Sequence, residues 1–263
     1  MNRINQLFND KKNNILSIYF CAGHPSLNDT VNTIQTLQNN GVDMIEIGIP
    51  FSDPMADGVV IQNAATKALQ NGMSVKLLFE QLKDIRKTVH IPLLFMGYLN
   101  PIMQFGFEDF CKSCNECGID GMIIPDLPFR DYQMYYKDIA EKYNLKIIML
   151  ITPETSEERI VEIDTHTDGF IYMVSSAATT GTQKDFEKQK QSYFQRIQKM
   201  ELKNPRMVGF GISNKNTFDT ACEYSCGAII GSLFVKLLEE LESSEKAIEQ
   251  LKITIFKNFV SSL

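Results

Sequence analysis

Short apolar runs alternate with amphipathic segments along almost the whole chain. We interpret eight of these runs as strands: ILSIYF, MIEIGI, IPLLFMGY, GMIIPD, KIIMLIT, GFIYMV, MVGFGI and AIIGS. Their nearly continuous content of Ile, Leu, Val and Met is typical of parallel strands that are covered on both faces, for which strict alternation of apolar and polar residues is not expected. The pattern therefore predicts eight parallel strands.

The segments between these runs carry apolar residues at helical spacing. Examples are TVNTIQTLQNNG, VKLLFEQLKDIRKTV, YQMYYKDIAEKYN and SYFQRIQKMEL, and Ser, Thr, Asp or Asn stands near most of the starts, as is common at helix N-caps. Strand-then-helix units repeated eight times in about 250 residues predict an α/β fold, a (β/α)₈ TIM barrel. A doubly wound open sheet stays open as the alternative, because the sequence does not show whether the sheet closes.

Both ends of the chain lie outside the eight repeats. Asn2 to Phe8 predicts a short N-terminal helix that plugs the bottom of the barrel, and the segment from Phe234 onward predicts extra C-terminal helices, either one broken helix or two. No Gly/Ser-rich linker and no shift in composition divides the chain. We therefore expect a single catalytic domain, residues 1–263.

Composition narrows the choice of partners and of location. The 263 residues are 44% hydrophobic, enough for a substantial core, and the formal net charge of −6 argues against nucleic acid or an anionic membrane as partner. No run reaches the roughly 20 apolar residues of a membrane span, and the N-terminal segment lacks the apolar core of a secretory signal. We expect a cytoplasmic protein with reduced cysteines.

Three of the six cysteines, Cys111, Cys114 and Cys117, stand three residues apart. Thiolates at close spacing can bind zinc or an iron–sulfur cluster. However, no fourth Cys or His follows at a suitable distance, and FEDFCKSCNECG has the pattern of an amphipathic helix in which free Cys packs as a small apolar residue. We therefore interpret these cysteines as part of the core and predict no metal site.

Two carboxyl groups near the end of the second strand are candidates for catalysis. Glu46 stands inside MIEIGI, where apolar surroundings would raise its pKa toward the range that suits a general acid and base. Asp57 follows in the loop PFSDPMADG, at the carboxyl end of the strand, where TIM barrels carry their active sites. The alternatives are an ion pair with Lys or Arg for Glu46, and a cap on a helix from Ile61 for Asp57. Together, two carboxyl groups in different surroundings favour a catalytic pair.

Turns that contain glycine follow the last two strands. GFGIS (Gly209 to Ser213) and GS (Gly231 and Ser232) each precede a helix, where backbone N–H groups can approach an anion closely. The loops after the seventh and eighth strands are also the usual phosphate position in TIM barrels, so we predict a phosphate site. After the sixth strand, SSAATTGTQKDF predicts a lid over the site, with an ordinary exposed loop as the alternative.

These motifs make the chain similar to the α subunit of tryptophan synthase over essentially its whole length. The resemblance rests on EIGIPFSDPMADG followed by IQNA, and on FCAGHPS, GYLNPI, PDLP, TTG, GFGIS and GS in the family's order. It implies a lyase that cleaves indole-3-glycerol phosphate to indole and D-glyceraldehyde 3-phosphate without a metal or organic cofactor of its own. A β subunit that contains pyridoxal phosphate would take up the indole to make L-tryptophan, in an α₂β₂ heterotetramer.

The resemblance also implies roles for individual residues. Glu46 would be the catalytic acid and base, and Asp57 the second catalytic carboxylate. The residues expected around the substrate are Gly181, Gly209, Gly211, Gly231 and Ser232 at the phosphate, Tyr19 and Phe210 in the wall of the indole pocket, Tyr172 at the catalytic mouth, and Thr180 on the lid. The residues expected at the β-subunit interface are Asp53, Asn100 and Pro128. Ala178, Thr179 and Val59 depart from the Gly-Val pair and the proline that the family usually has.

Two other functions stay open at this point. The first is a different phosphate-binding barrel, such as an isomerase or synthase, which would want a Lys or Cys at a strand end; the sequence has none in the right place. The second is a non-catalytic barrel that only binds and activates its partner. The presence of both Glu46 and Asp57 argues against the second.

Overall fold

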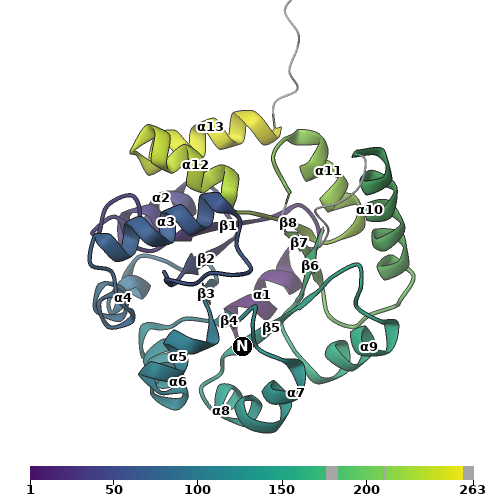
Figure 1. The fold of residues 1–263 in the computed structure, drawn as a ribbon, viewed down its shortest axis with the longest axis horizontal. Helices are drawn as coiled ribbons and strands as arrows, with labels where there is room; N and C mark the ends of the chain where they lie inside the picture. The colour runs from purple at the N-terminus through teal and green to yellow at the C-terminus, as the bar shows by residue number, and fades with distance from the viewer. Residues whose placement is uncertain (176–182, 210, 257–263) are drawn as a thin grey trace, which may run out of the picture.

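Eight parallel strands close into a barrel, in which each strand pairs with its neighbours in the sequence and β8 pairs with β1 (Figure 1). The computed structural model describes residues 1–175, 183–209 and 211–256, and the side chains of the same residues except 183–190. The predicted (β/α)₈ barrel is confirmed, and the alternative of an open sheet is wrong.

The eight strands coincide with the eight apolar runs. Their bounds are β1 (Ile15–Cys21), β2 (Met44–Gly48), β3 (Leu93–Met96), β4 (Gly121–Ile123), β5 (Lys146–Ile151), β6 (Ile171–Val174), β7 (Arg206–Gly209) and β8 (Gly227–Ile230). Every residue of β1 to β4 and of β8 is buried, as expected for strands enclosed by helices. Between β1 and β2, Tyr19 stands opposite Glu46, so the two side chains are neighbours on one face of the sheet.

The helices other than α1 form a ring around the barrel (Figure 1). Their bounds are α1 (Arg3–Asp10), α2 (Thr30–Asn39), α3 (Val59–Gln70), α4 (Val75–Leu82), α5 (Leu99–Phe105), α6 (Phe107–Cys117), α7 (Phe129–Asp131), α8 (Lys137–Lys142), α9 (Glu157–His166), α10 (Gln183–Gln198), α11 (Lys215–Tyr224), α12 (Ser232–Leu241) and α13 (Ser244–Phe256), with a 3₁₀ segment η1 (Ile85–Lys87) and a π-helical segment η2 (Tyr132–Tyr136). None of the helices in the described ranges has both the length and the apolar character needed to span a bilayer.

Three predicted helices differ in detail from the observed ones. The pattern over residues 75–89 becomes α4 followed by η1, and the pattern over residues 132–144 becomes η2 followed by α8. At the C-terminus the two-helix alternative is the right one, because Glu242 takes a left-handed conformation (φ 47°) between α12 and α13. Helical spacing of apolar residues does not distinguish a regular helix from one that changes its hydrogen-bond register within a turn.

The three closely spaced cysteines lie on α6, and all three are buried. Burial raises the pKa of the Cys111 thiol to about 12, so the thiol stays protonated and is a poor metal ligand in this environment. The helical core interpretation of CKSCNEC is confirmed. Within the described parts of the chain, no group of three or more His, Cys, Asp or Glu side chains has an arrangement that could hold a metal ion.

Helix α1 closes the bottom of the barrel, the end at which the strands begin (Figure 1). Asn2 caps the helix by accepting a hydrogen bond from the N–H of Ile4, while its amide donates to the carbonyl groups of Asp120 and Asn144, just before β4 and β5. Ile4 is fully buried. The predicted plugging helix is therefore confirmed.

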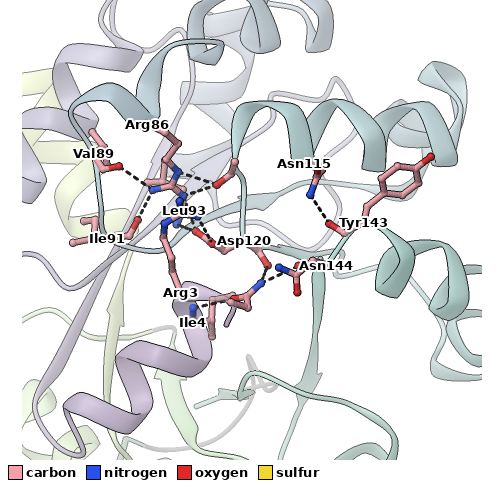
Figure 2. Close-up of polar contacts among 12 residues, drawn as sticks. Arg3, Ile4, Arg86, Val89, Ile91, Leu93, Asn115, Asp120, Tyr143 and Asn144 are labelled. Carbon is pink, nitrogen blue, oxygen red and sulfur yellow. Dashed lines mark hydrogen bonds and ion pairs between the residues drawn. The ribbon is translucent and has the colours of Figure 1, made fainter.

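A buried carboxylate organises the polar contacts at the bottom of the barrel, as Figure 2 shows. Asp120 accepts hydrogen bonds from Arg86 at 2.6 Å, from Arg3 at 3.0 Å, and from the N–H of Leu93 at 3.0 Å. Arg86 also donates to the carbonyl group of Gly118. This network joins α1, η1 and the starts of β3 and β4, far from the carboxyl ends of the strands.

We expect Asp120→Asn to lower the free energy of unfolding by about 3 kcal/mol, because Arg86 loses its charged partner in a largely buried site. Catalytic turnover should be unchanged, since Asp120 lies at the end of the barrel opposite to the strand ends that carry active sites. Urea denaturation followed by circular dichroism measures the effect. As a control, Asp84→Asn removes an exposed carboxylate paired with Lys87 and should leave the midpoint in place; equal midpoints for both variants would contradict the structural role of Asp120.

Candidate active site

A cavity of about 350 Å³ lies at the carboxyl ends of the strands. Its wall comes from β1, β2, β3, β6 and β8 and from the segments that follow β2, β7 and β8. The described residues that line it are Tyr19, Glu46, Asp57, Val60, Ile61, Met96, Tyr172, Gly211, Ile212, Ser213, Ile229, Gly231, Ser232, Leu233 and Lys236. Most of the wall is apolar, with a few polar groups, which is the usual character of a site for a small organic ligand.

Glu46 is fully buried in the wall of this cavity. One carboxyl oxygen, Oε1, accepts a hydrogen bond from Ser17 Oγ at 3.0 Å, and the other, Oε2, has no hydrogen-bond partner among the described residues. Burial raises the pKa of Glu46 to about 8, and the hydrogen bond from Ser17 acts in the opposite direction. None of the Lys, Arg or His side chains that the structure describes forms an ion pair with Glu46. Among these residues, the alternative that Glu46 is held in an ion pair is wrong.

Asp57 lies in the loop between β2 and α3 and is partly buried. Helix α3 begins at Val59 with Gly58 at the N-cap, so the helix starts two residues earlier than expected and the capping alternative for Asp57 is wrong. Its carboxylate instead accepts a hydrogen bond from Tyr98 Oη at 2.9 Å. Burial raises the pKa of Asp57, and the hydrogen bond from Tyr98 partly offsets this rise.

Tyr98 fixes the Asp57 loop from the end of β3. Its hydroxyl donates to Asp57 and accepts from the backbone N–H of Ala56 at 2.8 Å. The ring is buried and lies 5.4 Å from the ring of Phe51. A side chain that holds both the carboxylate and the backbone beside it restricts the positions that Asp57 can take.

Tyr19 and Tyr172 are buried in the cavity wall near both carboxyl groups. Burial raises the pKa of each phenol, and the nearby charges of Glu46 and Asp57 raise it further, so both phenols stay protonated. The tyrosines are closely fitted: a Cβ atom at Gly48 would lie 2.3 Å from Tyr19 Oη, and one at Gly209 would lie 2.1 Å from Tyr172 Oη. Gly209 does not line the cavity itself; the absence of its side chain makes room for the Tyr172 ring.

Another part of the cavity wall is made by the turns after β7 and β8 and by the start of α12. Gly211, with φ +73°, takes a left-handed conformation that favours glycine. Gly231 and Ser232 lie at the first turn of α12, where backbone N–H groups point out of the helix and can bind an anion. The structure thus brings three of the predicted phosphate residues to one wall.

The three residues expected at a partner interface are exposed and follow neighbouring strands. Asp53, Asn100 and Pro128 come after β2, β3 and β4. The loops after β3 and β4 are joined by a hydrogen bond from the N–H of Leu99 to Asp126 Oδ1 at 2.8 Å. All three residues therefore lie at the same end of the barrel as the cavity.

Three predicted residues, Thr180, Gly181 and Phe210, lie outside the described residues, as do Ala178 and Thr179 and most of the predicted lid. Conversely, sequence reasoning missed Ser17, Tyr98 and Lys236. Signals for them exist: Ser17 shares a strand face with Tyr19, Tyr98 stands at a strand end within GYLNPI, and Lys236 follows Ser232 by about one helical turn.

Comparisons with known proteins identify the family. The family model for the tryptophan synthase alpha chain matches residues 5–261. A tryptophan synthase alpha chain from Bacteroides thetaiotaomicron is 73% identical, over 96% of this chain and 98% of that protein, and one from Flavobacterium psychrophilum is 61% identical over 91% and 94%. The crystal structure of the alpha chain from Legionella pneumophila superposes with a TM-score of 0.82 at 33% identity, over 95% of this chain and 92% of that one. The chain therefore belongs to the tryptophan synthase alpha chain family.

Proposed function

We propose that the cavity around Glu46 and Asp57 is where this chain performs the reaction of its family. The chain is a carbon–carbon lyase that cleaves indole-3-glycerol phosphate to indole and D-glyceraldehyde 3-phosphate in a retro-aldol step, and the indole passes to a β subunit for L-tryptophan synthesis. This membership removes both alternatives, a different sugar-phosphate enzyme and a non-catalytic barrel. The observation that carries the site assignment is the buried carboxyl of Glu46, with one oxygen unpartnered in a cavity of suitable size.

Glu46 can act first as acid and then as base. With a pKa of about 8, its carboxyl is mostly protonated at neutral pH and can give its proton to the indole ring carbon that carries the glycerol chain. The resulting carboxylate removes the proton from the hydroxyl group next to the bond. That bond then breaks, its electrons return to the ring, and an aldehyde forms. Glu46 ends the cycle protonated, as it began.

Asp57 is suited to remain an anion while the ring is positively charged. Protonation of the ring carbon places positive charge toward the ring N–H, which a nearby carboxylate can stabilise and whose proton it can accept. The hydrogen bond from Tyr98 favours the ionised form of Asp57. Two carboxyl groups with different surroundings thereby hold the two protonation states that the reaction needs.

The substrate can be oriented along the cavity by its two ends. We place the phosphate against Gly211, Gly231 and Ser232, and the indole ring among the apolar side chains near Tyr19 and Tyr172. Thr180, Gly181 and Phe210 keep their predicted roles as proposals. Gly209 stays a proposal for the phosphate through its backbone alone, because the Tyr172 ring takes the place of a side chain there. Because the reaction needs only proton transfers, we assign no cofactor to this chain and place pyridoxal phosphate in the β subunit. We propose the cytoplasm as its location and an α₂β₂ heterotetramer docked through Asp53, Asn100 and Pro128.

A direct assay tests this function. Purified chain is mixed with indole-3-glycerol phosphate, and indole release is recorded with and without added β subunit. We expect indole to form in both samples, since both carboxyl groups belong to this chain. If indole forms in neither sample, the result contradicts the proposed site.

Tyr98→Phe should move the acidic limb of the pH–rate profile to higher pH. Loss of the hydroxyl removes a hydrogen bond that stabilises the Asp57 carboxylate, so the pKa of Asp57 rises further above its ordinary value and Asp57 is protonated at a higher pH. Among the described residues, Asp57 also interacts with the Cys21 thiol and with the phenols of Tyr19 and Tyr172, and Glu46 lines the same cavity. The phenols and the thiol stay neutral because burial raises their pKa values.

We expect the turnover of Tyr98→Phe to fall about tenfold near neutral pH, because the variant loses one hydrogen bond to a charged group. The alkaline limb, which we assign to Glu46, should stay in place because Tyr98 does not contact Glu46. Steady-state rates between pH 5 and about pH 9 check both limbs. An acidic limb at the wild-type position would show that Tyr98 does not stabilise the charged form of Asp57.

A further inference from the structure

The charges in the cavity wall are arranged asymmetrically. Glu46 and Asp57 come from β2 and the loop after it, whereas Lys236 comes from α12 on the side of the glycine turns. Lys236 is the only Lys, Arg or His among the described lining residues. A ligand that carries an anion at one end therefore meets carboxyl groups supplied by β2 and the loop after it, and a cation supplied by the helix after β8.

Lys236 lies on the face of α12 that also carries Ser232 at the helix start. Residues four apart lie on one face of a helix, and side chains lean toward the helix N-terminus. Lys236 is four residues after Ser232, and both residues line the cavity, while Phe234, Val235 and Leu238 are buried against the rest of the protein. Lys236 thus shares a face with the helix start at which we place the phosphate, while its ammonium nitrogen lies beside Glu240, one turn farther along the helix.

Lys236 is not held by a strong partner. Its ammonium nitrogen lies 3.7 Å from Glu240 Oε1, and the side chains are 62% and 54% exposed. An exposed ion pair between residues four apart on a helix contributes little to stability. The side chain can therefore exchange Glu240 for a ligand without loss of a buried contact.

We propose that Lys236 is a substrate-binding residue that neutralises the phosphate end of the substrate. Backbone N–H groups at the glycine turns supply hydrogen bonds, but a phosphate ester that enters a cavity with two carboxyl groups also needs a compensating positive charge. Lys236 provides this charge when its side chain turns from Glu240 toward Ser232, and it favours the orientation in which the indole ring faces Glu46. This role rests on the proposed function, because it deepens the assignment of the same cavity.

Binding of glycerol 3-phosphate to the purified chain tests this role without turnover. By isothermal titration calorimetry at low salt, we expect Lys236→Met to raise Kd about three- to tenfold, a moderate effect because the side chain is exposed. The difference should shrink at high salt, since added ions screen the lysine. Lys236→Arg should restore binding, because it restores the charge. With indole-3-glycerol phosphate, KM should rise by a similar factor in Lys236→Met while kcat is kept.

Lys137→Met is the matched control. Lys137 forms the same kind of pair, 3.8 Å from Glu141 four residues later, on a helix that does not line the cavity. The Kd of Lys137→Met for glycerol 3-phosphate should equal that of the wild type. Two results would overturn the role of Lys236. One is a wild-type Kd for Lys236→Met at low salt, and the other is an equal loss of affinity in Lys236→Met and Lys137→Met.

The outcomes for Lys236 and for the proposed function are separable. Glu46→Gln should bind glycerol 3-phosphate as the wild type does, because Glu46 faces the other end of the substrate. Weakened binding in Lys236→Met together with full turnover in Glu46→Gln would support Lys236 and overturn Glu46. Unchanged binding in Lys236→Met together with an inactive Glu46→Gln would overturn the role of Lys236 and support that of Glu46.

Discussion

Glu46→Gln lowers kcat for indole formation by about 10³-fold, within the range that a well-placed general acid and base supplies. The amide has the shape of the carboxyl group and can still accept the hydrogen bond from Ser17, but it can neither give a proton to the indole ring nor take one from the hydroxyl group. Indole release by the purified variant, measured at saturating substrate, gives the effect. Near-normal turnover in a folded variant would remove Glu46 as acid and base.

Stability measurements on the same variant provide the control. Below about pH 4.5, the ordinary pKa of a glutamate, the carboxyl is protonated in the folded and the unfolded chain. Between that pH and about 8 the unfolded chain loses the proton while the folded chain keeps it. This raised pKa therefore makes the wild type less stable as the pH rises through this window, with no further loss above it. Because Gln does not titrate, Glu46→Gln should be the more stable protein at pH 8 in urea denaturation.

Asp57→Asn has the second largest expected effect, a fall in kcat of about 10²-fold. The variant loses the anion that stabilises positive charge on the ring nitrogen, a loss of electrostatic stabilisation that falls on the transition state. Affinity for glycerol 3-phosphate should be kept, because we place Asp57 at the indole ring and not at the phosphate. The acidic limb of the pH–rate profile should disappear, and the alkaline limb near pH 8 should remain, since it reports Glu46.

Asp84→Asn is a suitable comparison for Asp57→Asn. It makes the same chemical change at a carboxylate on the outer surface, paired with Lys87, and should leave kcat and both limbs unchanged. An Asp57→Asn variant that turns over as fast as Asp84→Asn would contradict the role of Asp57. Retention of the acidic limb would assign that limb to another group.

The strands could be predicted because they are local features of the sequence. A parallel strand covered on both faces must be apolar throughout, and runs such as KIIMLIT and AIIGS have no competing interpretation as long amphipathic helices. The bounds of the helices could be predicted less accurately than those of the strands. At the interruption at η1, Arg86 contacts Gly118 and Asp120, which are distant in the sequence. The spacing of apolar residues encodes neither these contacts nor the π-helical turn at η2.

The site could be predicted only as a set of candidates. The position of Glu46 in an apolar run indicated a buried carboxyl, but whether a cation approaches it depends on which side chains meet across the barrel. The same is true of Tyr98, which reaches Asp57 from 41 residues away. Gly209 was expected beside phosphate, yet its Cβ position is filled by the Tyr172 ring, a contact between β6 and β7 that appears only in the closed barrel. The roles of the individual residues and the single domain over residues 1–263 stay predictions.

A direct measurement of the pKa of Glu46 tests the central claim, that a buried carboxyl is kept protonated at neutral pH in the cavity. Infrared difference spectra between the wild type and Glu46→Gln isolate the stretching band of one protonated carboxyl group, which is then followed as the pH is raised. We predict a band that is present at pH 7 and disappears with a midpoint near 8. A band already lost by about pH 5, close to the ordinary range of glutamate, would contradict the account.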